Sequence, residues 1–267
     1  MEAPLIPFFP PVWAEVFGED RHGVFAAFTL KGVEFVWRWI PRGRFRMGSP
    51  EDETGRWDDE GPQHEVTLTQ GFWMGETPVT QAQWMALMGE NPSQFQGERR
   101  PVERVTWREG VAFAAQLSEA VPGLSATLPT EAQWEYACRA GTTGAFHDGS
   151  ACTVPGGKDP ALERLGWYGE NSGGQTHDVK EKRPNAWGLY DMHGNVWEWC
   201  RDGWSSYGAE EVVDPEHDPA EDGANRVVRG GSWIDRARDC RAAFRSLRDP
   251  GFRDYFRGFR LAAGQEL

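Results

Sequence analysis

Three oxygen-bearing side chains, Asn195, Glu198 and Asp202, lie at short spacing beside glycines and could bind a metal ion. Amide and carboxylate oxygens are the ligands that calcium takes, about six to eight at a time and together with backbone carbonyls. The same pattern is typical of polar side chains that bond an irregular backbone nearby. The residues alone therefore leave a calcium site and a local hydrogen-bonding role both open.

Thiols, imidazoles and hydroxyls offer less support for chemistry. The six histidines include no His-x₃-His pair, and the serine-hydrolase pattern Gly-x-Ser-x-Gly is absent. The four cysteines are far apart and form no C-x-x-C pair. We therefore expect buried thiols rather than a zinc ribbon, a redox motif or a disulfide framework at Cys138, Cys152, Cys200 and Cys240.

The charge of the chain is unevenly distributed. Its 267 residues include 28 lysines and arginines against 41 aspartates and glutamates, a net charge of −13. Ten arginines and four aspartates lie between Arg226 and Arg260, which gives +6 there and leaves −19 elsewhere. Because these arginines alternate with acids and turns, and the acidic remainder repels a phosphate backbone, we expect no nucleic-acid partner.

The sequence predicts neither a membrane span nor a secretion signal. No run approaches the ~18 uninterrupted apolar residues of a transmembrane helix, and Met1–Pro11 lacks a basic start with a long apolar stretch. A cytoplasmic location is the default expectation. Display on a cell or phage surface stays open.

The strand pattern begins at residues 33–40, where large apolar side chains alternate. Shorter strands are predicted at 45–47 and 66–69, and the acid- and glycine-rich stretch 49–63 between them is expected to be an exposed loop. After residue 141 regular patterns fade into a long loop-rich stretch. Further strand-like pieces return at 226–229, 241–244 and 258–262.

Capping boxes predict the starts of three helices, because Thr80, Thr106 and Thr130 are each followed three residues later by glutamine or glutamate. A glycine, or proline and glycine, stops each helix. We expect the second helix to bury Trp107, Val111, Ala114 and Ala115, and the third to bury Trp134, Ala137 and Cys138. With no repeat or linker, the pattern predicts one α+β domain over residues 1–267.

Six segments together resemble one family, the formylglycine-generating-enzyme (sulfatase-modifying factor) domain: Phe45–Ser49, Glu76–Thr80, Leu128–Ala137, Gly188–Trp199, Arg229–Trp233 and Gly258–Arg260. The resemblance covers 38–262. It implies a C-type lectin fold with a small twisted antiparallel sheet, a few helices and a loop-rich insertion. Residues 1–37 are similar to the lead-in of retroelement variable proteins.

The active oxidases of that family hold copper(I) through two cysteines, since this metal prefers soft sulfur ligands. The resemblance places Asp235 at the first of these positions and Ala237 at the second, and leaves Cys240 without a partner thiol. It therefore implies a noncatalytic member that requires no cofactor. A copper-dependent formylglycine-generating oxidase is the alternative.

The resemblance also implies a structural calcium site formed by the side chains of Asn195 and Glu198 with the carbonyl of Val196. A second family site would begin at 171–172. Its later ligand position is Lys180, and lysine cannot coordinate calcium, so that site is doubtful.

Residues 229–262 occupy the place of the variable region in retroelement variable proteins, where asparagine codons diversify and a frame of arginine, glycine and tryptophan survives. The predicted binding residues lie between frame positions: Ile234, Asp235, Arg236, Arg238, Phe244, Leu247, Phe252, Asp254, Tyr255 and Phe256. Rings among turns and charges are typical of binding surfaces. We therefore predict a noncatalytic receptor or display protein whose unknown ligand is a protein or cell-surface molecule. A structural or regulatory paralogue with a fixed partner is a third interpretation.

Overall fold

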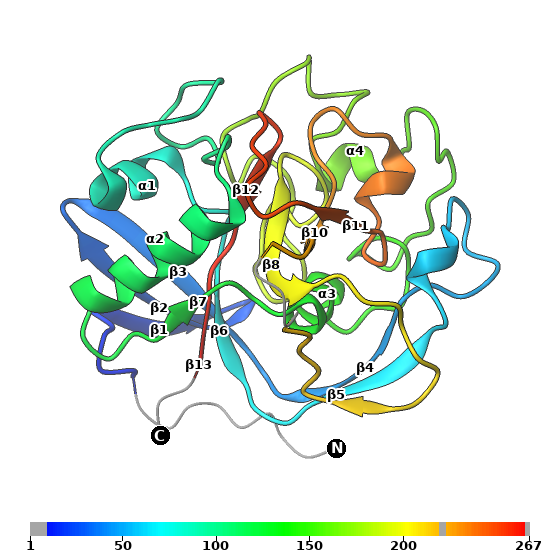
Figure 1. Ribbon diagram of the computed structural model, residues 1–267, viewed down its shortest axis with the longest axis horizontal. Coiled ribbons are helices and arrows are strands. Elements are labelled where there is room, and N and C mark those ends of the chain that lie inside the picture. Colours follow the sequence, from blue (N-terminus) through cyan, green and yellow to red (C-terminus); the bar gives the residue numbers. More distant parts are fainter. Residues whose placement is uncertain (1–9, 219–222, 265–267) are drawn as a thin grey trace.

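The computed structural model describes residues 10–218 and 223–264. Its largest sheet has six strands in the order β1-β2-β3-β6-β13-β7, all paired antiparallel. The strands are β1 (Val16–Asp20), β2 (Gly23–Leu30), β3 (Val33–Ile40), β6 (Phe72–Gly75), β13 (Ala262–Gly264) and β7 (Ala126–Thr127). Figure 1 shows α2 lying across this sheet.

Two smaller sheets complete the strand framework. One has the order β11-β10-β8-β12, and the other has the order β4-β5-β9. Pairing is antiparallel except for β12 on β8 and β9 on β5. Their bounds are β11 (Arg245–Arg248), β10 (Arg226–Arg229), β8 (Trp197–Gly203), β12 (Arg257–Phe259), β4 (Gly43–Met47), β5 (His64–Leu68) and β9 (Val212–Val213).

Three main helices begin at the predicted threonines. They are α1 (Gln81–Met88), α2 (Trp107–Ala120) and α3 (Glu131–Arg139). In each, the threonine side-chain oxygen accepts the backbone N–H of the glutamine or glutamate three residues later, and the side chain of that residue accepts the backbone N–H of the threonine. The short α4 (Leu162–Leu165) and the 3₁₀ turns η1 (Asp58–Glu60) and η2 (Ala237–Cys240) complete the set. Among the described residues, no helix has the length and apolar character that crossing a membrane requires.

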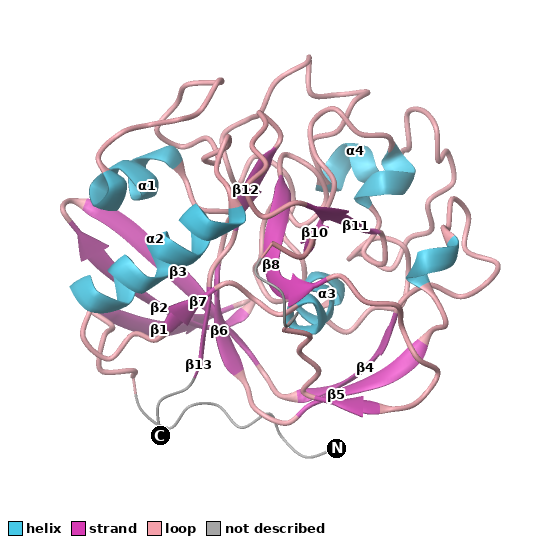
Figure 2. Ribbon diagram, viewed as in Figure 1, coloured by secondary structure: helices cyan, strands magenta, loops and turns pink. Residues whose placement is uncertain are grey.

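The core contains many of the tryptophan rings. Trp13 packs on Phe28, Trp37 and Trp73 with ring centroids 5.5–5.9 Å apart. The described part of the lead-in, residues 10–37, therefore contributes to the core, because β1 and β2 extend the main sheet and Trp13 packs into its ring cluster. The long insertion between α3 and β8 is mostly loop, as expected (Figure 2).

Several predictions of local structure are confirmed. The strand at 33–40 and the strand at 226–229 have the predicted bounds, and the strands near 45–47 and 66–69 are present. The third helix buries the three predicted residues. The four cysteines are free and buried.

Other predictions are wrong. On the second helix Ala114 is buried as predicted and Trp107 is half-buried against the core, but Val111 and Ala115 face solvent. The helix instead buries Gly110, Phe113 and Leu117, because Phe113 packs on rings of other elements. Residues 241–244 form no strand, and the strand begins only at Arg245. The piece at 258–262 is two strands, β12 and β13, in different sheets. The sequence pattern predicts none of the strands β1, β2, β6, β7, β8 and β9.

The stretch 49–63 is only partly the exposed loop that we expected. Its acids Asp58 and Asp59 face solvent, but Glu60 is fully buried and Glu53 is half-buried. Both carboxylates bind Arg241 from the C-terminal segment. The loop therefore lies against the region where the binding residues are predicted.

Candidate ligand-binding surface

The backbone turns sharply where β10 ends. Gly230 and Gly231 both have left-handed φ angles, +95° and +70°. A Cβ at Gly231 would lie 2.6 Å from Sγ of Cys240 and 2.7 Å from the carbonyl oxygen of Asp239. Only glycine fits this approach, which folds the segment after β10 onto η2.

Buried arginines on either side of this turn form ion pairs in the interior of the protein. Arg229 binds Glu135, Arg245 binds Glu131 at 2.6 Å, and Arg260 binds Glu198 at 2.9 Å, with these side chains almost wholly buried. Burial alone would raise the pKa of the Glu135 carboxyl, but the charges of Arg139 and Arg229 hold it below its ordinary value. The charged arginine frame is therefore neutralised inside the protein.

Four predicted binding residues are exposed. Ile234, Phe252 and Tyr255 keep exposed fractions of 48%, 49% and 43%, and Arg236 is exposed as well. The backbone of Tyr255 is fixed, because Nε1 of the buried Trp233 donates a 3.0 Å hydrogen bond to the Tyr255 carbonyl. At Tyr255 a buried ring thus fixes the backbone while the side chain faces solvent.

Two predicted acids are half-buried and engaged within the protein. Asp235 accepts hydrogen bonds from Nε1 of Trp197 at 2.8 Å and from the hydroxyl of Ser232, and burial raises the pKa of its carboxyl. Asp254 pairs with Arg257 and accepts the N–H of Phe256 at 3.2 Å. These carboxylates shape the loops that carry the exposed rings.

The remaining predicted residues are half-buried. Phe244 contacts Trp197 and packs against the core, and Phe256 packs against the core beside Tyr255. The guanidinium of Arg238 lies 5.2 Å from the ring centre of Trp57, and Leu247 lies on β11. Of these four, Phe256 is the one whose contact with an exposed member of the group, Tyr255, is a direct ring contact among the described residues.

Sequence reasoning missed three residues beside this surface. Phe95, from the segment between α1 and α2, lies with its ring centre 5.3 Å from Trp233 and 6.4 Å from Tyr255. Arg104 is exposed and its N–H donates to the carbonyl of Asp254 at 2.9 Å. Trp57, from the 49–63 stretch, is 48% exposed. For Phe95 and Trp57 the available signal is a single ring in a polar loop, and for Arg104 the sequence offers none.

The predicted calcium ligands are already engaged. Oδ1 of Asn195 accepts the His177 N–H at 3.0 Å, and its Nδ2 donates to the His177 carbonyl and to Asp191. Both oxygens of Glu198 bind the Arg260 guanidinium, and Nε1 of Trp134 donates to one of them. The Arg260 guanidinium thus occupies the place beside the Glu198 carboxylate where a calcium ion would supply positive charge. This donor set, with Val196 buried beside it, therefore does not fit a calcium ion.

Neither do Asp235, Ala237 and Cys240 form a thiolate site. Cys240 is fully buried, and burial raises the pKa of its thiol well above the ordinary value, which disfavours the thiolate. Ala237 is buried and offers no ligand atom. The carboxylate of Asp235 is held by Trp197 and Ser232, as described above.

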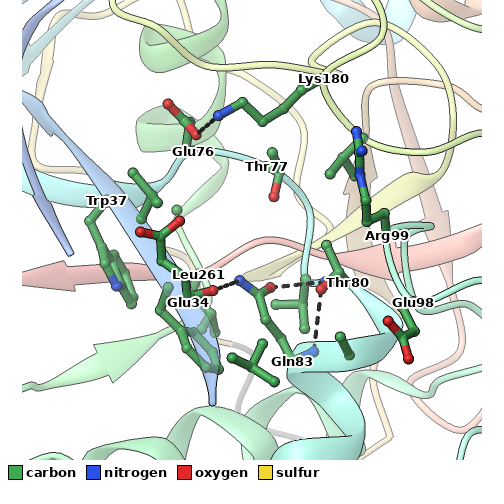
Figure 3. A pocket seen from close by; sticks show the side chains of 17 residues that line it. Glu34, Trp37, Glu76, Thr77, Thr80, Gln83, Glu98, Arg99, Lys180 and Leu261 are labelled. Atoms are coloured by element: carbon green, nitrogen blue, oxygen red, sulfur yellow. Dashed lines mark hydrogen bonds and ion pairs between the residues drawn. The ribbon is translucent and has the colours of Figure 1, made fainter. Parts of the chain in front are cut away.

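A separate cavity of about 250 Å³ opens beside the start of α1, between that helix and β3 (Figure 3). Glu76 in its wall binds Lys180 at 2.5 Å and Arg38 at 2.6 Å. Gln83 accepts the N–H of Thr80, and its Nε2 donates to the Glu34 carbonyl. Several polar side chains of this cavity are thus engaged in holding the fold.

Comparisons with known proteins agree with this architecture. Treponema denticola variable protein 1 has a TM-score of 0.77 and 32% identity, covering 90% of this chain and 99% of its own. PvdO from Pseudomonas aeruginosa has a TM-score of 0.75 and 27% identity, covering 94% of this chain and 99% of its own. The protein therefore has the C-type lectin fold of the formylglycine-generating-enzyme type, similar to that of a variable protein.

Sequence comparisons identify the family. The formylglycine-generating enzyme of Streptomyces coelicolor is 30% identical over 85% of this chain and 89% of its own length. The model of the sulfatase-modifying factor enzyme 1-like domain matches residues 32–264. The chain belongs to the sulfatase-modifying factor enzyme 1-like family.

Proposed function

We propose that this protein is a noncatalytic ligand-binding protein of the retroelement variable type, presenting residues 234–256 to a protein or cell-surface molecule. One contrast carries the proposal. The frame arginines are buried and ion-paired, whereas Ile234, Phe252 and Tyr255 are nearly half exposed. Exposed rings add little to a core but give large contact area at low rotamer entropy.

The mechanism is tolerance of substitution. Because buried arginines, Gly231 and Trp233 fix the backbone, outward side chains can change without unfolding the domain. The fold likeness to Treponema denticola variable protein 1 supports this function.

The alternative, a copper-dependent oxidase, is favoured by the likeness to the Streptomyces enzyme. Asp235, Ala237 and the buried Cys240 speak against it. Titration with copper(I) distinguishes the two functions. We expect no tight stoichiometric binding, and tight binding that Cys240→Ala abolishes would establish the oxidase instead.

The proposed function is tested first in the neighbouring DNA. We expect a near-copy of the 3′ end of the gene that differs at adenines, beside a reverse-transcriptase gene. Independent isolates of the gene should then differ at codons within 234–256 and agree at the frame positions. Isolates that vary as much at the frame as between its positions would contradict the proposal.

Tolerance is tested on the protein. The combined variant Ile234→Ser, Phe252→Ser and Tyr255→Ser should keep its Tm within about 2 °C, since exposed substitutions change stability little. The control Phe259→Ser, in the core, should lower Tm steeply. A steep loss in the combined variant would show that these side chains serve the core.

A further inference from the structure

Positive charge is left over around the predicted binding residues. The frame arginines form ion pairs with buried carboxylates. Arg104, Arg236 and Arg248 are exposed, and none of these three has an ion pair among the described residues. Arg253 is about half exposed and pairs with Glu109 at 2.6 Å. The exposed Asp249 accepts the N–H of Gly251 and so supports the local turn.

Contacts link Arg104 and Arg253 to the segment that carries the exposed rings, and Arg236 and Arg248 belong to the same C-terminal segment. Arg104 donates its N–H to the Asp254 carbonyl, and Nη1 of Arg253 donates to the Arg104 carbonyl at 3.4 Å. The rings of Phe252 and Phe256 both lie on the guanidinium of Arg257, at 5.4 and 4.8 Å. The 95–104 segment and the C-terminal segment therefore form one surface.

The buried Arg257 pairs with Asp254 and also experiences the charge of the exposed Arg248. Arg257 is 1% exposed, and its Nε has no partner among the described residues. Burial, and then the charge of Arg248, lower the pKa of its guanidinium to about 9. An anionic group placed on this surface would relieve the repulsion between these arginines.

We propose that the surface formed by Phe95, Arg104, Arg236, Arg248, Phe252 and Tyr255 binds an acidic polypeptide segment that also carries an apolar or aromatic anchor. The proposal rests on the proposed function and specifies its partner. Arginine and aromatic side chains are the residues that dominate such interfaces. Phe95 and Arg104 lie outside the 229–262 region, so they would contribute a constant part of the binding surface.

An acidic polypeptide fits better than the other common polyanion, a nucleic acid. Outside Arg226–Arg260 the chain carries a charge of −19. A duplex carries a charge every ~1.7 Å and would extend past the arginines over this acidic remainder. A short acidic segment ends within the surface, and screening over about 8 Å hides the more distant acids.

The test is selection of peptides of about 12 residues from a random phage library on the immobilised full chain. Binding of the selected peptides is then measured by fluorescence anisotropy with three variants. The surface-arginine variant combines Arg104→Gln, Arg236→Gln and Arg248→Gln. The ring variant combines Phe252→Ser and Tyr255→Ser. The control removes the same charge from exposed arginines elsewhere, by Arg21→Gln, Arg44→Gln and Arg183→Gln.

We expect selected peptides to be enriched in aspartate and glutamate. Kd should rise about tenfold in the surface-arginine variant and in high salt, and less than about twofold in the control. If the selected peptides are neutral or basic, and their Kd is unchanged in the surface-arginine variant but rises in the ring variant, the acidic character of the partner is overturned and the binding surface stands. Peptides insensitive to both variants would overturn the binding surface itself. Equal or tighter binding of an oligothymidine of the same length would overturn the polypeptide assignment.

Discussion

Arg241 and Glu60, 181 residues apart in the chain, form an ion pair in which both side chains are 0% exposed. The guanidinium donates to both oxygens of Glu60, to Glu53 at 2.5 Å and to the Gly55 carbonyl at 2.9 Å. One arginine thus attaches the whole 49–63 stretch to the segment that follows η2.

Replacing Arg241 by glutamine should be strongly destabilising. The change leaves the buried carboxylate of Glu60 without its charged partner, which typically costs about 3–5 kcal/mol of unfolding free energy. Urea denaturation at neutral pH measures the loss. The control is Arg44→Gln, because Arg44 and Glu65 form a pair whose side chains are 70% and 38% exposed. That change should cost less than about 1 kcal/mol.

A double-mutant cycle with Glu60→Gln isolates the pair. Because the two groups interact directly, the second substitution should restore part of the stability that Arg241→Gln removes. If the losses simply add, the coupling between the two residues is absent and this account of the frame is wrong.

Local signals in the sequence predicted local structure well. The capping box at Thr130 needs only residues within one turn, and the structure has it as predicted. Which face of a helix packs against the rest of the protein was more difficult to predict. Val111 is exposed and Phe113 is buried because Phe113 packs on Trp84 and Phe259, which are distant in sequence. Periodicity reports that a helix has an apolar side but not what lies opposite it.

The surroundings of the proposed binding residues were predicted only in part, for the same reason. The exposure of Phe252 and Tyr255 follows from their place among turns. The contact of Phe95 with Trp233 joins residues 138 positions apart, and no spacing within the chain encodes it. The internal roles of Asp235 and Asp254 depend on donors that only the folded chain brings close.

The stability of the protein should depend on the protonation of Glu103, which lies beside Phe95 in the proposed binding surface. This residue is 0% exposed; Oε1 accepts the Phe95 N–H at 2.8 Å, and Oε2 has no partner among the described residues. Burial raises the pKa of its carboxyl from 4.5 to about 7, although two backbone N–H groups and Arg104 oppose the rise. The folded state therefore favours the protonated form.

Because the pKa is raised on folding, this contribution to stability is complete below pH 4.5 and is lost as the pH rises through about 7. Glu103→Gln removes the titration. Between about pH 5 and pH 8 the original protein should lose roughly 2 kcal/mol more than the variant. Urea denaturation across this range measures both slopes. The control Glu119→Gln, on the exposed side of α2, should leave the slope unchanged, and parallel curves for Glu103→Gln would contradict the assignment.

The stability cost of replacing Gly231 has two parts, the steric contact with η2 and the left-handed backbone conformation, and a control glycine separates them. Gly174 has a similar left-handed φ, +79°, but a Cβ there would meet nothing within 4 Å. Gly174→Ala should cost only the conformational strain, about 1 kcal/mol. Gly231→Ala should cost a further ~2–3 kcal/mol, because the methyl group would collide with Sγ of Cys240 and the Asp239 carbonyl.

Chemical denaturation of the two variants gives this difference directly. Since Gly231 also directs the chain toward Ile234, the backbone amides of 232–236 should exchange hydrogen faster in Gly231→Ala than in Gly174→Ala. Equal stability losses, with unchanged exchange at 232–236, would show that the contact with η2 does not fix the backbone from which Ile234 projects. The frame would then have to act through its arginines alone, and the Arg241 and Gly231 variants together would distinguish these two arrangements.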